Sequence, residues 1–217
     1  MNQFDDVGFA IEALRSGEMI LIVDDHDREN EGDLVVAAEF ATSEVINFMS
    51  LRGRGLICVA LDASFAGRLG LEPMVRETED DLGTAFTVSV DGAPTFGVTT
   101  GISARDRATT IQVILDPAHG PDTLRRPGHM FPLIAHPHGV LGRRGHTEAS
   151  TDLCEMAGLE KAAVIVEILR PDGEMARETE LNRFARRHGL VKVSVEDIAR
   201  AQLSSGRFEP ETATASR

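Results

Sequence analysis

The sequence predicts an α+β fold, with one domain over residues 1–217 in which helices surround a mixed β-sheet. Apolar residues at helical spacing and short apolar runs typical of buried strands both occur along the chain. They mix without a regular strand–helix–strand rhythm, which favours an α+β arrangement. No internal repeat or linker divides the 217 residues, and 42% of them are hydrophobic, so one core can form.

The individual elements follow from local signals. Apolar side chains over residues 7–14 lie at helical spacing, and Gly17 stops this helix. Ser43 and Ser194 are predicted N-caps of later helices, and an Asp91-Gly92 turn is predicted to end the fourth strand. The predicted helices span residues 7–14, 43–49, 62–69, 103–115, 148–157, 178–188 and 195–203. The predicted strands span residues 19–23, 34–38, 56–61, 86–90, 162–169 and 191–193. Residues 117–144 show no clear period, and residues 204–217 are predicted to form a flexible tail.

Composition excludes several classes of function. Lys and Arg number 22 and Asp and Glu 35, so the formal charge is −13, which disfavours nucleic acid and anionic membranes as partners. The two cysteines, Cys58 and Cys154, stand too far apart in the sequence to form a CxxC pair, so we expect a reducing, cytoplasmic setting. No apolar run is long enough to span a bilayer, and the first residues do not resemble a signal peptide.

An acidic loop over residues 24–33 is the first candidate site. Its ten residues, DDHDRENEGD, hold six acids and one arginine. The loop lies between two predicted strands and ends near Gly32, so its crowded carboxylates are held close together and repel one another unless a cation or proton intervenes. Hard oxygen ligands select Mg²⁺, Mn²⁺ or Ca²⁺. A solvated charge run is the alternative interpretation. A calcium-binding EF-hand is excluded, because Ala38 stands where its closing glutamate should be.

The segment Arg143–Glu148 is the second candidate. Thr147 is a predicted N-cap, and the N–H groups of the helix start, with Arg143 nearby, would suit a phosphate group. His146 could ligate a metal or move a proton there. The alternative is an ordinary capped helix with two surface arginines.

Glu167 and His129 are two further candidates. Glu167 interrupts an apolar strand and would be a half-buried carboxylate with a raised pKa, suited to a general base, if both faces of the strand are covered. A strand with one face exposed to water is the simpler alternative. His129 lies in a proline-braced turn, where a structural and a catalytic histidine are equally credible. His136 and His138 are predicted to lie in a surface loop rather than in a metal site.

Over about Phe9 to Ala201, the sequence resembles the 3,4-dihydroxy-2-butanone 4-phosphate synthase family of riboflavin biosynthesis. Four segments in this order carry the resemblance: residues 24–33, TTGISARDR at 99–107, RPGHMFPL at 126–133 and GHTEA at 145–149. The family implies a lyase that converts D-ribulose 5-phosphate to L-3,4-dihydroxybutan-2-one 4-phosphate and formate. It implies a Mg²⁺-stabilised enediolate and a skeletal rearrangement, with Mn²⁺ as a possible substitute, in a homodimer whose sites lie near the subunit interface.

The resemblance also implies roles for individual residues. Glu29 and His146 match the metal ligands, and His129 and Glu167 match two catalytic residues. The residues that match substrate-binding positions are Arg28, Glu29, Asp33, Arg143, Arg144, Gly145, His146, Thr147 and Glu167.

Two residues depart from the family pattern, and two other functions stay open. Arg144 stands where the family usually has a small residue, and Arg52 where it often has histidine. The chain lacks the cysteines of a fused GTP cyclohydrolase II domain, so we expect a monofunctional protein. A non-catalytic relative that binds a sugar phosphate or a metal, and a phosphosugar isomerase, are the alternatives.

Overall fold

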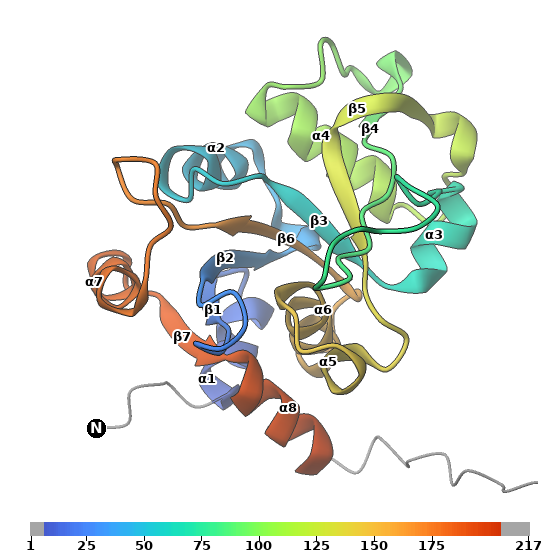
Figure 1. Ribbon diagram of the computed structural model, residues 1–217. Coiled ribbons are helices and arrows are strands. Elements are labelled where there is room, and N and C mark those ends of the chain that lie inside the picture. The colour runs from blue at the N-terminus through green and yellow to red at the C-terminus, as the bar shows by residue number, and fades with distance from the viewer. Residues whose placement is uncertain (1–6, 205–217) are drawn as a thin grey trace, which may run out of the picture.

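The computed structural model describes residues 7–204. In it, a mixed seven-stranded sheet lies between two layers of helices (Figure 1). The sheet order is β4-β5-β3-β6-β2-β1-β7. The strands are β1 (Ile20–Val23), β2 (Gly32–Ala37), β3 (Cys58–Leu61), β4 (Val90–Gly92), β5 (Leu124–Ile134), β6 (Ala162–Glu167) and β7 (Val191–Ser194). Parallel pairs (β1 with β7, β3 with β5) occur beside antiparallel ones, so the predicted α+β class with a mixed sheet is confirmed.

The helices divide between the two faces of the sheet. They are α1 (Val7–Arg15), α2 (Ser43–Arg52), α3 (Ala63–Leu69), α4 (Ala104–Leu115), α5 (Gly139–Gly142), α6 (His146–Met156), α7 (Glu178–His188) and α8 (Val195–Ser204). Buried side chains of α2, α3, α4 and α7 pack on one face, and those of α1, α5, α6 and α8 on the other. Figure 1 shows α2 and α4 above the strands and α1, α5, α6 and α8 below them. Both faces of the central strands are therefore covered, which explains their continuous apolar runs.

Local signals account for most helix boundaries. Asp62 accepts a hydrogen bond from Ser64 N and caps α3, and Ser103 accepts one from Asp106 N and caps α4. The predicted Ser194 cap is confirmed, because its Oγ accepts from Asp197 N. The predicted Ser43 cap is wrong by one residue, since Thr42 accepts from Val45 N and Ser43 begins α2.

Three further predictions are wrong. Residues 117–144 are not irregular throughout, because β5 occupies Leu124–Ile134 and pairs with β3 and β4. Asp91 and Gly92 lie within β4 and do not form a turn. Helix α6 begins at His146 with Gly145 as its N-cap, so Thr147 is inside the helix.

Strand β2 starts at Gly32, two residues earlier than predicted, which places Asp33 in the sheet opposite Ile22 and Glu167. The early start follows from pairing on both sides, since β1 and β6 both extend to this level. Of the predicted tail, Ser204 ends α8 and the rest lies outside the described residues.

Neither a disulfide nor a membrane-spanning helix is found in the part of the chain that the structure describes. Cys58 and Cys154 are both buried and free. No described helix combines the length and apolar character that crossing a bilayer requires.

Candidate active site

The acidic loop between β1 and β2 is folded around the side chain of Asp24. Its Oδ2 accepts hydrogen bonds from Glu29 N at 2.9 Å and Arg28 Nη1 at 3.0 Å, and its Oδ1 accepts from Glu31 N at 2.8 Å. Asn30 completes the return with a left-handed φ of 56°, a conformation that asparagine adopts more readily than most residues. This part of the loop is thus an ordered turn, which argues against the solvated charge run.

Arg177 holds the same loop from outside. It lies at the start of α7, and its Nη1 donates to the carbonyl oxygens of Glu29 at 2.8 Å and Asn30 at 2.5 Å. The guanidinium also lies 3.9 Å from Glu31 Oε1. The backbone of the two residues beside the site is therefore fixed by a charged donor from another element.

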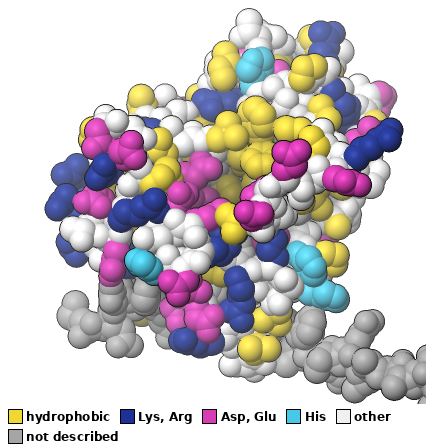
Figure 2. Space-filling view, in the orientation of Figure 1, with side chains coloured by type: hydrophobic (Ala, Val, Ile, Leu, Met, Phe, Trp, Pro, Cys, Tyr) yellow, Lys and Arg dark blue, Asp and Glu magenta, His cyan; other side chains and the backbone are white. Residues whose placement is uncertain are grey.

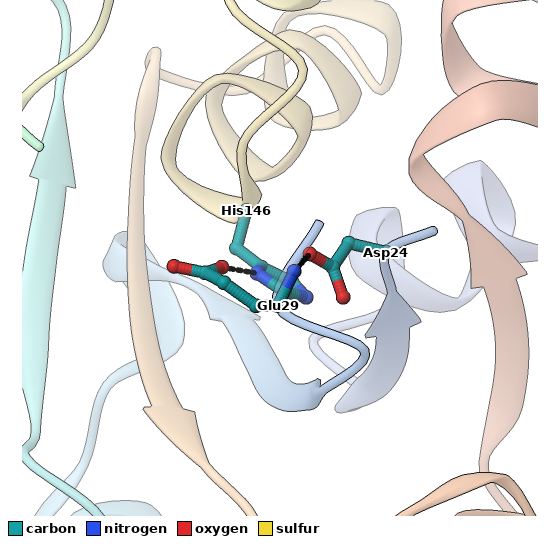
Figure 3. Close-up of side chains that lie close together, drawn as sticks. All are labelled: Asp24, Glu29 and His146. Carbon is teal, nitrogen blue, oxygen red and sulfur yellow. Dashed lines mark hydrogen bonds and ion pairs between the residues drawn. The ribbon is translucent and has the colours of Figure 1, made fainter. Parts of the chain in front are cut away.

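His146 meets the acidic loop at the start of α6 (Figure 3). Its Nδ1 lies 3.4 Å from Glu29 Oε2, and one ligand atom each of Asp24, Glu29 and His146 lie within 4.8 Å of one another. His146 is only 7% exposed, and among the described residues its buried Nε2 has no hydrogen-bond partner. A buried, unpartnered imidazole nitrogen beside carboxylates is costly without a ligand, so this donor set fits a divalent metal ion.

The charges of the site are strongly coupled. Hydrogen bonding to His146, together with the Arg28 charge and against the effect of burial, lowers the pKa of Glu29. Burial favours the neutral form of His146, but Asp33 and Glu29 outweigh it and raise the pKa of His146 to about 9. Burial, reinforced by Glu167 and Glu29 against the opposing effect of His146, raises the pKa of Asp33 to about 7. Excess negative charge around one imidazole is the electrostatic condition that a cation relieves.

A cavity of about 150 Å³ joins the acidic loop, the start of α6 and the sheet. It brings together most of the predicted site residues: Arg28, Glu29, Asp33, Arg143, His146, Thr147 and Glu167. Asp33, Cys58 and Glu167 come from neighbouring strands and share the face that α6 covers. In Figure 2, acidic side chains gather near the centre of the view, beside a group of hydrophobic side chains.

Glu167 is positioned by two glycines that lead into β3. Its Oε2 accepts a hydrogen bond from Leu56 N at 2.8 Å, and its backbone oxygen accepts from Gly55 N at 3.2 Å. A Cβ on Gly55 would fall 2.3 Å from Glu167 Oε2, and one on Gly53 would fall 2.6 Å from Val166. Only glycine allows the backbone to approach this closely. Glu167 is half-buried at the end of β6.

Arg143 connects α6 to a distant loop. Its guanidinium donates to Glu148 Oε2 and Thr84 Oγ1, both at 2.8 Å, and to the carbonyl oxygen of Leu82 at 2.9 Å. Glu148 is almost fully buried and also accepts from His136 N. Arg143 therefore lies over the start of α6, and a helix start of this kind favours anions.

Three predicted site residues are not among those that line the cavity: His129, Arg144 and Gly145. Arg144 forms a partly exposed ion pair with Glu196. Gly145 is the N-cap of α6, where a Cβ would fall 2.4 Å from Arg143 Nη1. His129 lies on β5 and pairs with Asp91, away from the acidic loop.

Several lining residues were missed in the sequence: Glu31, Cys58, Thr84, Phe86, Leu133 and Ile165. Glu31 belongs to the acidic loop. It stands two residues after Glu29, and this alternation could have indicated that both side chains point to the same side. Thr84 and Phe86 come from a distant loop and gave none. Burial raises the pKa of the Cys58 thiol well above its usual value, so Cys58 is a neutral wall residue and unsuited to act as a nucleophile.

Comparison with known proteins gives a consistent result. Residues 9–201 match the family model described as 3,4-dihydroxy-2-butanone 4-phosphate synthase. The riboflavin biosynthesis protein RibBA of Aquifex aeolicus is 51% identical over 201 residues, which cover 93% of this chain and 50% of that protein. The 3,4-dihydroxy-2-butanone 4-phosphate synthase of Pseudomonas syringae pv. tomato is 50% identical, over 93% of this chain and 54% of that protein. The chain thus spans about half the length of these curated relatives.

A solved structure is similar over its whole length. It is a 3,4-dihydroxy-2-butanone 4-phosphate synthase in complex with two magnesium ions, with a TM-score of 0.88 and 42% identity. The match covers 94% of this chain and 100% of that one. The order of strands and helices described above is therefore similar to that of a metal-bound protein.

Proposed function

The chain belongs to the 3,4-dihydroxy-2-butanone 4-phosphate synthase family, and on this premise we propose that it is a lyase of riboflavin biosynthesis. Its substrate would be D-ribulose 5-phosphate, and its products L-3,4-dihydroxybutan-2-one 4-phosphate and formate. The carbon balance is four in the phosphorylated product and one in formate, so the reaction must break a carbon–carbon bond. One observation carries the proposal: a buried imidazole with an unpartnered nitrogen stands beside Glu29 in a cavity that also holds Glu167 and Arg143.

Glu29 and His146 would hold a Mg²⁺ ion, with Mn²⁺ as a possible substitute. Asp24 lies close enough to contribute, but its oxygens already accept three hydrogen bonds within the loop, so we assign it chiefly to loop geometry. When bound, the ion would stabilise the negative charge that develops on the substrate's ketone and hydroxyl oxygens. His146 must then be neutral, because a nitrogen that binds a metal carries no proton.

Glu167 and His129 would transfer the protons. The reaction needs a base that removes a proton from carbon and an acid that assists a departing hydroxyl group. Glu167 lines the cavity, and its Oε2 is fixed by Leu56 N, so its carboxylate is oriented before substrate binds. His129 lies outside this cavity, on β5, and its side chain is 43% exposed, so its role in proton transfer rests on the family resemblance.

Arg28, Arg143 and the start of α6 would bind the phosphate group. Arg28 and Arg143 line the cavity with Thr147, which lies in the first turn of α6. The N–H groups of that turn and two guanidinium groups would attract an anion in spite of the net charge of −13. Asp33 would face the sugar hydroxyls. Arg144 and Gly145 would complete this segment, with Gly145 acting through the close approach that it allows.

We propose a homodimer in the cytoplasm as the working form. Leu51 in α2 and Leu56 just before β3 are exposed hydrophobic residues, and they support an interface with a second subunit at this part of the surface. Two free buried cysteines support a reducing compartment.

A formate assay tests the function. The protein is incubated with ribulose 5-phosphate and Mg²⁺, and formate is measured with and without EDTA. We expect formate only with the metal. A phosphosugar isomerase would keep all five carbons together, and a non-catalytic relative would gain thermal stability with substrate without forming product; either outcome would contradict the proposal.

A further inference from the structure

Asp91, the side chain that lies against His129, has no role in the function proposed above. Asp91 on β4 contacts His129 twice: Oδ1 accepts from the backbone N–H at 2.8 Å, and Oδ2 lies 2.7 Å from the ring Nδ1. The Asp91 side chain is 13% exposed, whereas the His129 side chain is 43% exposed. One edge of the ring is thus fixed against a largely buried carboxylate, and the rest of the ring stays accessible.

The pairing of β4 with β5 creates this contact. Val90 pairs with Met130, but the next residue, Asp91, pairs with Arg125, so the register shifts and β5 carries extra residues between them. A bulge of this kind re-aims a side chain. Gly128 makes it possible, because a Cβ there would fall 2.0 Å from the backbone of Val90. The extra residues bring His129 onto Asp91.

A second loop covers the pair. Gly101 has a φ of +89°, and a Cβ on it would fall 2.0 Å from Asp91 Oδ2 and 2.5 Å from His129 Nδ1. Asp106 fixes this loop, since its carboxylate accepts from Gly101 N at 3.1 Å and from the backbone and hydroxyl of Thr99. The TTGISARDR motif thus supports the Asp91–His129 contact, and its backbone shields that contact from water.

We propose that Asp91 is a positioning residue that fixes His129 as the Nδ1–H tautomer and leaves Nε2 as the nitrogen that exchanges protons with the substrate. A carboxylate only accepts hydrogen bonds, so Nδ1 must carry the proton. The same relation orients catalytic histidines in hydrolases, where the acid fixes the tautomer and takes up no proton. The inference rests on the proposed function only for the role of His129 in turnover; the tautomer itself is independent of it.

Asp91→Asn is the informative substitution. The Asn oxygen must keep accepting from the His129 backbone N–H, because the alternative leaves that group facing a second donor. The amide NH₂ then faces Nδ1 and forces the proton onto Nε2. The chain offers a matched control in Asp116, which lies 3.7 Å from His119 Nε2, too far for a hydrogen bond, while His119 Nδ1 bonds to the Val113 carbonyl. Asp116→Asn removes one acid beside a histidine without changing a tautomer.

The first experiment reads the tautomer directly. Two-bond ¹H–¹⁵N spectra of histidine-labelled protein are recorded without substrate, at a pH where the imidazole is neutral, and His129 is assigned with His129→Gln. We expect Nδ1–H in the wild type and in Asp116→Asn, and Nε2–H in Asp91→Asn. An Nε2–H wild type, or an unchanged tautomer in a folded Asp91→Asn protein, would overturn the inference.

The second experiment reads turnover. We expect Asp91→Asn to lower kcat for formate release by at least about 100-fold, within the range that a proton-transfer group contributes. KM should change by less than about threefold, since the phosphate-binding residues are untouched, and Asp116→Asn should match the wild type. Full kcat in Asp91→Asn would overturn the inference. If the wild type itself released no formate, the proposed function would fail, while the spectra would still decide whether Asp91 orients His129.

Discussion

Replacing Arg177 by alanine should weaken metal binding while leaving the protein folded. Arg177 contacts no predicted ligand atom, but its guanidinium donates to the carbonyl oxygens of Glu29 and Asn30 from the start of α7. Without it, the loop that carries Glu29 keeps the Asp24 hydrogen bonds and loses its outer support. The bound arrangement must then be selected from a wider set of loop conformations.

The magnitude follows from the two hydrogen bonds. A charged donor contributes ~1.5–3 kcal/mol when buried, but the Arg177 side chain is 46% exposed, so about 1 kcal/mol each is appropriate. Two such bonds give about 2 kcal/mol, and since about 1.4 kcal/mol corresponds to a tenfold change, the Kd for the metal should rise about 30-fold. Arg177→Lys keeps the positive charge but lacks the planar guanidinium group, so its Kd for the metal should lie between those of the wild type and Arg177→Ala.

Calorimetric or paramagnetic titration with Mn²⁺, in the absence of substrate, measures this effect. Arg170→Ala is the matched control, because Arg170 is a partly exposed arginine that pairs with Asp172 on the turn before α7. Equal Mn²⁺ affinity in Arg177→Ala, Arg170→Ala and the wild type would show that Arg177 does not preorganise the metal site.

Three other predictions concern the site itself. Glu29→Gln and His146→Ala should each reduce formate release below detection while circular dichroism stays native; substantial turnover in either variant would remove that residue from the metal site. Gly55→Ala should lower kcat by at least about tenfold, because the added Cβ would fall 2.3 Å from Glu167 Oε2 and push the carboxylate out of position. Kinetics equal to the wild type would show that the position of Glu167 is unimportant. Burial raises the pKa of Asp33 from 3.8 to about 7, so in EDTA the metal-free protein should lose stability as pH rises through this range, because the folded state holds a proton that the unfolded chain releases. In Asp33→Asn, the melting temperature should fall less steeply with pH over this range than in the wild type. An unchanged dependence of the melting temperature on pH would contradict the shifted pKa.

The candidate site was largely predictable because its chemistry is concentrated in short segments. Glu29 and His146 stand in an acidic loop and at a helix start, and each has a recognisable local pattern. Their meeting point was less predictable from the residues alone, because it depends on β1 and β2 pairing next to the helix that covers them. The resemblance supplied what local spacing could not.

The errors arise where tertiary pairing overrides local signals. Pro127, Gly128 and Pro132 made β5 look irregular, yet the strand forms because β3 and β4 pair on either side of it. Thr147 has good N-cap chemistry, but Gly145 takes that place because Arg143 and Glu148 pack too closely for a side chain there. Thr84 and Phe86 reach the cavity across a long separation in sequence, for which local patterns hold no information.

The most direct test of the account is to follow uniformly ¹³C-labelled ribulose 5-phosphate by ¹³C NMR with the protein and Mg²⁺. We predict one formate carbon for each four-carbon phosphorylated ketone, and no conversion after EDTA treatment until metal is restored. Five-carbon sugar phosphates as the only products, or conversion that persists in EDTA, would contradict it.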